Sequence, residues 1–475
     1  MTFNSAVFFA FLAVFLPVYF AIRSWGAKKV WLLVGGLVFY GWFNPKYLAL
    51  VFLSTTIDYV CVAIISTRQN ERPRKLALLT SIVSNLTVLA TFKYFDFFVG
   101  NVTALLHGLG ARASAPTLSL VLPIGISFYT FEAISYAVDV YKKRTTAARS
   151  YLDLLLFITF FPHLVAGPIV RARDFLPQLE TPRRVRPEVI LPAAQWIIVG
   201  YFFKVGVADN LSSSVDRVFD APNSAATTEA WLGTIYFSFQ IFCDFAGYTL
   251  IARGLAKLIG FDLTPNFDYP YLARGFSDFW RRWHISLSSW LRDYLYIPLG
   301  GSRSGRWATY RNLMLTMLLG GLWHGAAWTF VVWGALHGGY QVVEHAAREW
   351  LGISSKSDRD RRRRVAVELA QIAVTFVLVL VAWVFFRAAA VADAMTILRA
   401  MFWVPSWKLT MPAKTMLKDG IWLVPMAVYF VFGYLEARGV TRALSPVPRA
   451  VALGALAFVT LVCREVSDAF IYFQF

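Results

Sequence analysis

The chain has 475 residues, of which 57% are hydrophobic, 17% aromatic and only 16% charged. This composition excludes an ordinary soluble domain, in which about a quarter of the residues are charged, and indicates an integral membrane protein. The formal net charge of +18 does not indicate a nucleic-acid partner, because the basic residues gather in short loops between apolar runs.

The first apolar run, residues 6–22, has the length of a membrane span. No basic leader precedes it and no small-residue cleavage site follows it, so we expect a retained span and no removable signal peptide. Arg23, Lys28 and Lys29 follow this run, and the basic loop 68–75 follows the third apolar run. Because Lys and Arg favour the cytoplasmic side, we expect both loops inside and the N-terminus outside.

Further apolar runs continue along the chain. They lie near 30–43, 47–66, 76–99, 119–140, 151–170, 189–207, 229–250, 312–350, 366–386, 420–435 and 449–463. We expect one polytopic, all-α domain over residues 1–475, with roughly ten to twelve membrane helices of about 20 residues each. Some would be short or re-entrant where Pro and Gly interrupt them. The charge block 358–364 predicts another inside loop near anionic lipid.

The central stretch Phe276–Gly301 is too polar to span a membrane. At 100° per residue its large apolar side chains form one stripe opposite its charged ones. The stripe contains Phe279, Trp280, Trp283, Leu287, Trp290, Leu291, Tyr294 and Leu295. This pattern predicts one amphipathic helix at a membrane interface, capped by Ser277 and ended by Pro298. His284 would lie at the edge of the stripe, between protein and a wet cavity.

The stretch Leu318–Gly339 is apolar enough for the membrane but contains His324 and His337. Polar side chains at that depth are costly and indicate function. Glycines beside His324 would let a neighbouring helix or an acyl chain approach the backbone. On one straight helix His337 would lie about 220° from His324, so the two would not share a face. The alternative for each histidine, as for His163, is a buried packing residue.

These two stretches resemble the membrane-bound O-acyltransferase family, and specifically its bacterial branch that acetylates alginate and related exopolysaccharides. Four further segments are similar to that branch: GISFYTFEAISYAVDVYKKR (125–144), FFPHLVAGPIVRARDFLPQL (160–179), IYFSFQIFCDFAGYTLIARGLAKLIGF (235–261) and FIYFQF (470–475). The resemblance covers nearly the whole chain. Two departures bear on the choice of donor or acceptor: His163 replaces a usual Gln, and GYTLIARG lacks a usual acidic residue.

The resemblance implies the fold of that family, with re-entrant segments and interfacial helices around a central tunnel, and a catalytic region at about 120–345. It places the family's buried histidine on His324, within GGLWHGAAW, and its second functional histidine on His284, within RRWHIS. His324 would activate an acceptor hydroxyl as a base, and His284 would position a substrate or polarise the carbonyl. A covalent acyl-histidine is the other route.

The implied acyl donor is acetyl-CoA, whose phosphates require a basic site on the cytoplasmic face. Arginine suits phosphate through its planar fork of donors. The candidates around the central stretch are Arg281, Arg282, Arg292, Arg303 and Arg306. The alternative is that these residues hold lipid headgroups. No metal is expected, because the three cysteines lack metal or redox spacing.

The implied acceptor is a hydroxyl of an exported polysaccharide such as alginate, cellulose or peptidoglycan, whereas acetyl-CoA is cytoplasmic. We therefore expect a multi-pass protein of the bacterial inner membrane with a channel for the acyl group. The resemblance further implies an extracytoplasmic SGNH-type acetyltransferase as partner. The alternatives from other classes are a scaffold without chemistry and a polysaccharide transporter or flippase. Against a transporter, the two halves of the chain show no matching repeats.

Overall fold

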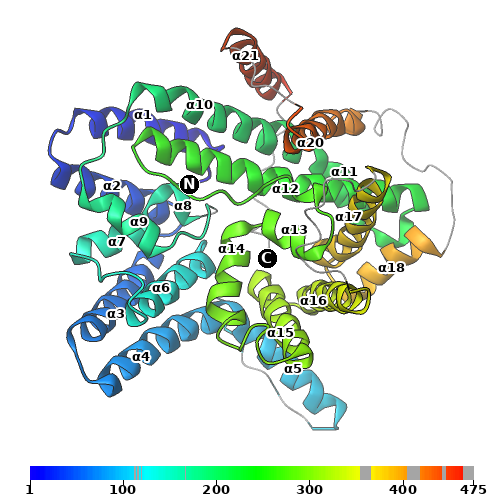
Figure 1. Ribbon diagram of the computed structural model, residues 1–475, viewed down its shortest axis with the longest axis horizontal. Helices are drawn as coiled ribbons and strands as arrows, with labels where there is room; N and C mark the ends of the chain where they lie inside the picture. Colours follow the sequence, from blue (N-terminus) through cyan, green and yellow to red (C-terminus); the bar gives the residue numbers. More distant parts are fainter. Residues whose placement is uncertain are drawn as a thin grey trace. The chain divides into compact units, whose positions relative to one another are not determined.

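The structure is a computed structural model that describes residues 1–111, 114, 117–118, 120–165, 167–352, 365–403, 418–440 and 446–463. All regular elements within these ranges are helices (Figure 1), which confirms the predicted all-α class. The predicted charge block 358–364 and the segment 470–475 lie outside the described residues.

Packing divides the chain into two compact units, and each is described by itself. One consists of Met1–Ile197 with Tyr248–Thr264, and the other of Ile198–Gly247 with Pro265–Phe475. Two of the three boundaries fall inside helices, and the third, between Thr264 and Pro265, falls in a loop. The single domain predicted for residues 1–475 stays a prediction.

The first unit holds the N-terminal helices. They are α1 (Ala6–Ala21), α2 (Trp25–Gly41), α3 (Tyr47–Thr67), α4 (Glu71–Leu89), the π-helical turn η1 (Ala90–Tyr94), α5 (Phe95–Gly108), α6 (Ile126–Tyr141), α7 (Tyr151–Thr159), α8 (Phe161–Leu164), α9 (Ala172–Glu180) and most of α10 (Pro187–Tyr201). α6 is buried along nearly its whole length. It packs against α3 and α4, which lie side by side in Figure 1.

A buried carboxylate joins α3 to α4 in this unit. Asp58 on α3 accepts hydrogen bonds from Ser81 Oγ at 2.5 Å and from Asn85 Nδ2 at 2.9 Å, both on α4. All three side chains are buried. Hydrogen bonds of this kind hold helices together where lipid supplies no hydrophobic driving force.

The second unit holds the central and C-terminal helices. They are η2 (Phe202–Ala208), α11 (Asp209–Phe219), η3 (Pro222–Ser224), the first part of α12 (Thr227–Leu258), η4 (Pro270–Leu272), α13 (Phe276–Arg282), α14 (Ile285–Leu291), η5 (Arg292–Tyr296), α15 (Arg306–His324), α16 (Trp328–Trp350), α17 (Val365–Arg387), α18 (Val391–Phe402), α20 (Leu423–Ala437) and α21 (Pro446–Val462). α15 and α16 form an antiparallel pair, and α17 packs on α16 (Figure 1).

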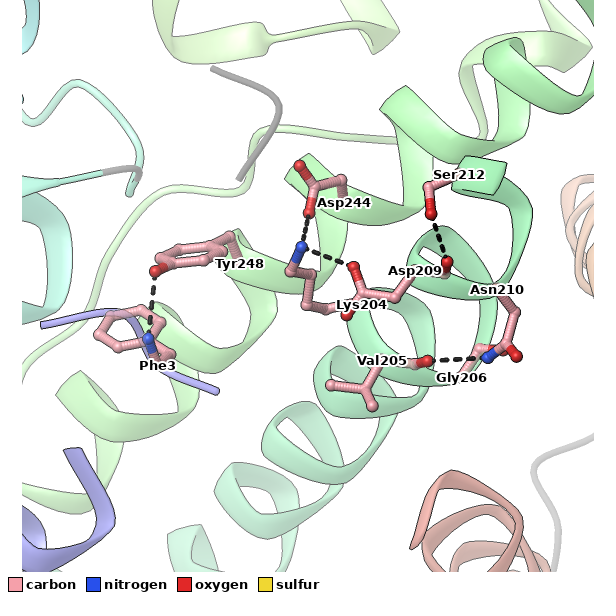
Figure 2. A network of polar contacts seen from close by, with 9 residues as sticks. All are labelled: Phe3, Lys204, Val205, Gly206, Asp209, Asn210, Ser212, Asp244 and Tyr248. Carbon is pink, nitrogen blue, oxygen red and sulfur yellow. Dashed lines mark hydrogen bonds and ion pairs between the residues drawn. The ribbon is translucent and has the colours of Figure 1, made fainter. Parts of the chain in front are cut away.

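A buried ion cluster lies in the second unit (Figure 2). Lys204 Nζ, in the π-helical turn η2, lies 2.8 Å from Asp209 Oδ1 and 2.7 Å from Asp244 Oδ1 of α12. All three side chains are buried. α12 approaches the end of α10 closely at this point. A Cβ on Gly247 would lie 2.6 Å from the carbonyl oxygen of Gly200.

Within the described residues, six helices are long and apolar enough to cross a membrane. They are Tyr47–Thr67, Glu71–Gly108, Pro187–Phe219, Thr227–Leu258, Val365–Arg387 and Lys418–Ala437, and two shorter apolar helices are Ala6–Ala21 and Val451–Val462. The chain is therefore polytopic, as predicted. The sequence suggested more spans because it counted every apolar run, whereas runs such as 151–170 fold into short helices.

Candidate active site

The central stretch breaks at His284. α13 ends at Arg282 and α14 begins at Ile285, while His284 between them adopts φ 42° and ψ 55°, in the left-handed region. Asn266 holds this bend: its backbone carbonyl accepts the N–H of Ile285 at 2.9 Å, and its side-chain oxygen accepts the N–H of Ser286 at 3.2 Å. The prediction of one continuous helix was therefore wrong. Helical periodicity gives no indication of a single residue at which the backbone changes direction.

The buried face predicted for this stretch is largely confirmed. Its buried members are Phe279, Trp280, Trp283, Leu287, Trp290 and Leu291, whereas Tyr294 and Leu295 are half-buried. The predicted cap was wrong, since α13 follows Gly275 and not Ser277. The carboxylate of Glu344 on α16 instead accepts the backbone N–H groups of Phe276 and Ser277, at 2.7 and 3.0 Å.

His284 is fully buried among rings. Its imidazole meets the ring of Phe245 edge-on, with 4.6 Å between centroids, and lies 6.0 Å from that of Trp323. The expectation that one side would face a wet cavity was wrong, because the side chain is 0% exposed. Burial lowers the pKa of His284 to about 3, so its imidazole is neutral at physiological pH and offers one N–H donor and one acceptor.

His324 is the last residue of α15 and is also buried. Its ring centroid lies 6.3 Å from that of His284. Rings of Trp323, Trp333 and Phe386 surround it, with centroids at 5.0, 5.1 and 5.2 Å. The structure therefore brings together the two histidines that the sequence predicted as the site.

α15 stops at His324 because the next residue leaves the helix. Gly325 is extended, with φ −158° and ψ 149°, and a Cβ there would lie 2.1 Å from the ring of Phe330. α16 then begins at Trp328, so the apolar stretch 312–350 is a helical pair and not one helix.

The break changes the geometry of His337. The sequence argument placed His324 and His337 on different faces of one helix, but they belong to two helices and both contact Trp333. The centroid distances from Trp333 are 5.1 Å to His324 and 4.7 Å to His337. His337 is 0% exposed, and its two ring nitrogens have no hydrogen-bond partner among the described residues.

A cavity of about 690 Å³ opens beside this cluster, between α13–η5 and the α15–α16 pair. Its lining contains several basic, acidic and hydroxyl side chains. These are Ser277, Arg281, Ser288, Ser289, Arg292, Tyr296, Ser302, Gln341, Glu344, His345, Arg348 and Glu349. Trp280 also lines the cavity, and its ring centroid lies 5.1 Å from that of His337. Trp280 therefore lies between the polar cavity and His337.

The five predicted arginines differ in their position relative to the cavity. Arg281 and Arg292 line the cavity, and Arg292 also pairs with Asp293, with Nε 2.8 Å from Oδ1. Arg282 is held by acidic neighbours, with Nε 3.0 Å from Asp278 Oδ1. Arg303 and Arg306 lie in the turn before α15 and at its start, outside the lining residues.

Sequence reasoning missed the contribution of α16 to this cavity. Gln341, Glu344, His345 and Arg348 all line it. They recur at the spacing of one helical face, in a helix whose preceding turns are apolar. That polar face was the available signal, but it points to a site only when α13 is known to lie opposite.

His163, singled out in the sequence, belongs to the first unit. It is 1% exposed, and its Nε2 lies 3.7 Å from Glu132 Oε2. Its ring packs against Phe157 and Phe160, with centroids at 6.1 and 5.6 Å. This environment is the packing role that the sequence suggested as the simpler interpretation.

A family model described as MBOAT, membrane-bound O-acyltransferase family, matches residues 37–386. The chain belongs to the membrane-bound O-acyltransferase family. The predicted family and the predicted enzyme class are therefore confirmed, and they exclude the transporter and scaffold alternatives.

Several relatives are similar over most of the chain. A probable alginate O-acetylase, AlgI, of Pseudomonas syringae pv. tomato is 40% identical over 86% of this chain and 77% of that protein. A peptidoglycan O-acetyltransferase of Helicobacter pylori is 35% identical over 84% of this chain and 80% of its own. A teichoic acid D-alanyltransferase of Streptococcus thermophilus is 27% identical over 69% of this chain and 83% of its own.

Proposed function

We propose that this chain transfers an acetyl group from acetyl-CoA toward the hydroxyls of an exported polysaccharide. The observation that carries the proposal is the pair of buried imidazoles, His284 and His324, 6.3 Å apart between centroids. His324 contacts Trp333, which packs against Trp280, a lining residue of the cavity. Relatives named for O-acetylation of alginate and of peptidoglycan favour a polysaccharide acceptor.

In this proposal His324 is the base. The oxygen of an acceptor hydroxyl attacks the thioester carbonyl carbon while an imidazole nitrogen of His324 takes the hydroxyl proton. The C–S bond then breaks, and the departing thiolate takes that proton from His324. His284, neutral because of its burial, orients the hydroxyl or the carbonyl through a hydrogen bond. Its ring is held by the left-handed bend at the start of α14.

The donor's phosphates would bind in the cavity. Arg281 and Arg292 come from the central stretch. Arg348, which also pairs with Glu344 at 3.0 Å, comes from α16. Guanidinium groups bind phosphate through paired N–H donors, and three of them around one cavity of about 690 Å³ match the several phosphate groups of coenzyme A. Arg348 is thus added to the set that the sequence suggested.

The proposed topology separates donor from acceptor. Acetyl-CoA is cytoplasmic and the polymer is exported, so the acyl group must cross the bacterial inner membrane through this protein. We assign the final transfer to an extracytoplasmic SGNH-type acetyltransferase partner. Full-rate acetylation of polysaccharide by the purified chain alone would show that this relay is unnecessary.

The experiment that tests the function is the acetyl-ester content of the host's extracellular polysaccharide when His324→Ala replaces the wild-type protein. Loss of ester at normal membrane abundance of the variant is expected. The matched control is His107→Ala, an exposed histidine that should leave ester content unchanged. Unchanged ester in His324→Ala would overturn the proposed chemistry.

A further inference from the structure

Trp333 carries a buried hydrogen-bond donor that the packing does not use. Its side chain is 1% exposed, and its Nε1–H has no acceptor among the described residues. A buried donor left without an acceptor loses its hydrogen bond to water without compensation. Such a group in a folded protein needs an explanation, and a ligand that supplies the acceptor is one.

The position of Trp333 is fixed by its backbone. Its neighbour Gly334 packs against α15 so closely that a Cβ there would lie 2.4 Å from the carbonyl oxygen of Met317. Gly321 on α15 would likewise place a Cβ 2.2 Å from the carbonyl oxygen of Phe330. Because the two helices meet backbone to backbone, Trp333 is held against His324, one turn beyond Gly321.

The Trp333 ring lies between the two histidines of the α15–α16 pair. It meets the His324 ring edge-on, at 5.1 Å between centroids and 81° between planes. It lies 4.7 Å from the His337 ring and 5.7 Å from the Trp280 ring. Since Trp280 also lines the basic cavity, Trp333 lies where an acyl group entering from that cavity would reach His324.

We propose that Trp333 is a catalytic residue whose indole Nε1–H donates a hydrogen bond to the carbonyl oxygen of the acyl group during transfer. This inference rests on the proposed function. When the hydroxyl oxygen bonds to the carbonyl carbon, the C=O electron pair moves onto oxygen and the hydroxyl proton moves to His324. The indole N–H stabilises the resulting oxyanion. When the pair returns, the C–S bond breaks and the thiolate leaves with the proton.

Two other buried indoles also present an N–H without an acceptor among the described residues, but they lie elsewhere. Trp280 and Trp383 are also buried, and the Nε1–H of each also has no acceptor among the described residues. Trp280 forms the cavity wall. Trp383 stacks on Trp333 at 6.1 Å and packs at a tilt of 56° against Trp283 at 4.9 Å. Of Trp280, Trp333 and Trp383, Trp333 is the one whose ring contact with His324 is observed. The adjacent Trp323 also contacts the His324 ring, at 5.0 Å.

The test measures acetyl transfer from acetyl-CoA by the purified full chain, with its partner protein present, for wild type and Trp333→Phe. Loss of one oxyanion donor lowers kcat by about 100-fold, and KM for acetyl-CoA should change little. The matched control is Trp383→Phe, which removes an equally buried N–H one ring further from His324 and should keep kcat near wild type.

A second substitution separates the N–H from the shape of the ring. Replacing Trp333 by 3-benzothienylalanine keeps the bicyclic ring and exchanges N–H for sulfur, so packing is retained. The same fall in kcat is expected. An acyl donor that carries C=S in place of C=O provides a further check, because the sulfur of C=S accepts hydrogen bonds poorly. This donor should lower kcat of the wild type much more than it lowers kcat of either Trp333 variant.

The outcomes are distinct. A wild-type kcat retained in the benzothienyl variant, or an equal C=S effect in wild type and variants, overturns the role of Trp333 and leaves the proposed function intact. A wild type that transfers no acetyl group, with its partner and acceptor present, overturns the proposed function and this inference together.

Discussion

Gly321 and Gly334 meet where α15 crosses α16: a Cβ on Gly321 would lie 3.2 Å from the Cα of Gly334. This close approach places His324 and Trp333 in contact. Small residues at helix crossings have this effect in membrane proteins generally, because they let backbones approach.

Gly334→Ala should therefore weaken both stability and activity. The added methyl group would press on backbone atoms of Met317 and Leu318, which cannot move without separating the helices. Overpacking of this kind costs about 1–3 kcal/mol, so the thermal midpoint in detergent should fall. Gly339→Ala on the same helix is the control, since a Cβ there meets nothing within 4 Å. Equal midpoints for the two variants would contradict the tight crossing.

Lys204→Met should be strongly destabilising. The substitution leaves Asp209 and Asp244 buried without their common cation, and removing one partner of a buried ion pair costs about 3–5 kcal/mol. Membrane abundance and the thermal midpoint measure the loss, which adding Asp244→Asn should partly restore. The control is Lys257→Met, whose partner Asp262 is 69% exposed and whose loss should cost about 0–1 kcal/mol.

Arg281→Ala should raise KM for acetyl-CoA about tenfold, with kcat little changed, because one charge-assisted phosphate contact is lost. Arg281 lines the cavity, and no ion pair holds it among the described residues. Arg303→Ala with Arg306→Ala is the comparison, since neither residue lines the cavity. Steady-state kinetics over donor concentration give both constants. A larger rise in KM for the Arg303 and Arg306 variant would place the phosphates on the turn before α15.

Acid should destabilise the wild type partly through His284. Because burial lowers the pKa of His284 to about 3, the unfolded chain binds a proton there that the folded chain does not, at pH values between about 6.5 and 3. Stability therefore falls as pH falls through that window, by at most about 1.4 kcal/mol per pH unit for this group.

The measurement for His284 is the drop in thermal midpoint between pH 7 and pH 5. The drop should be smaller in His284→Asn, which keeps a polar side chain but does not titrate. His107→Asn, at an exposed position, should match the wild type. If His284→Asn lost as much stability on acidification as the wild type, then His284 would not be the buried neutral group described here.

Prediction from the sequence was most accurate for the burial of side chains, which a local pattern indicates. The stripe from Phe279 to Leu291 was buried as predicted, because helical periodicity depends only on which residues avoid water. The same pattern missed the left-handed bend at His284. That bend is held by Asn266, a contact that no periodicity within the stretch could reveal.

The sequence by itself determined that the chain is a helical membrane protein, and its RRWHIS and GGLWHGAAW segments indicated its family and two candidate histidines. Only the tertiary structure brought His284 to His324, set Trp333 between His324 and His337, and placed Arg348 opposite Arg281. The physical reason is that hydrophobicity and helix periodicity are properties of neighbouring residues. The site depends instead on where α15 crosses α16 and where the chain bends, and those contacts join residues far apart in the sequence.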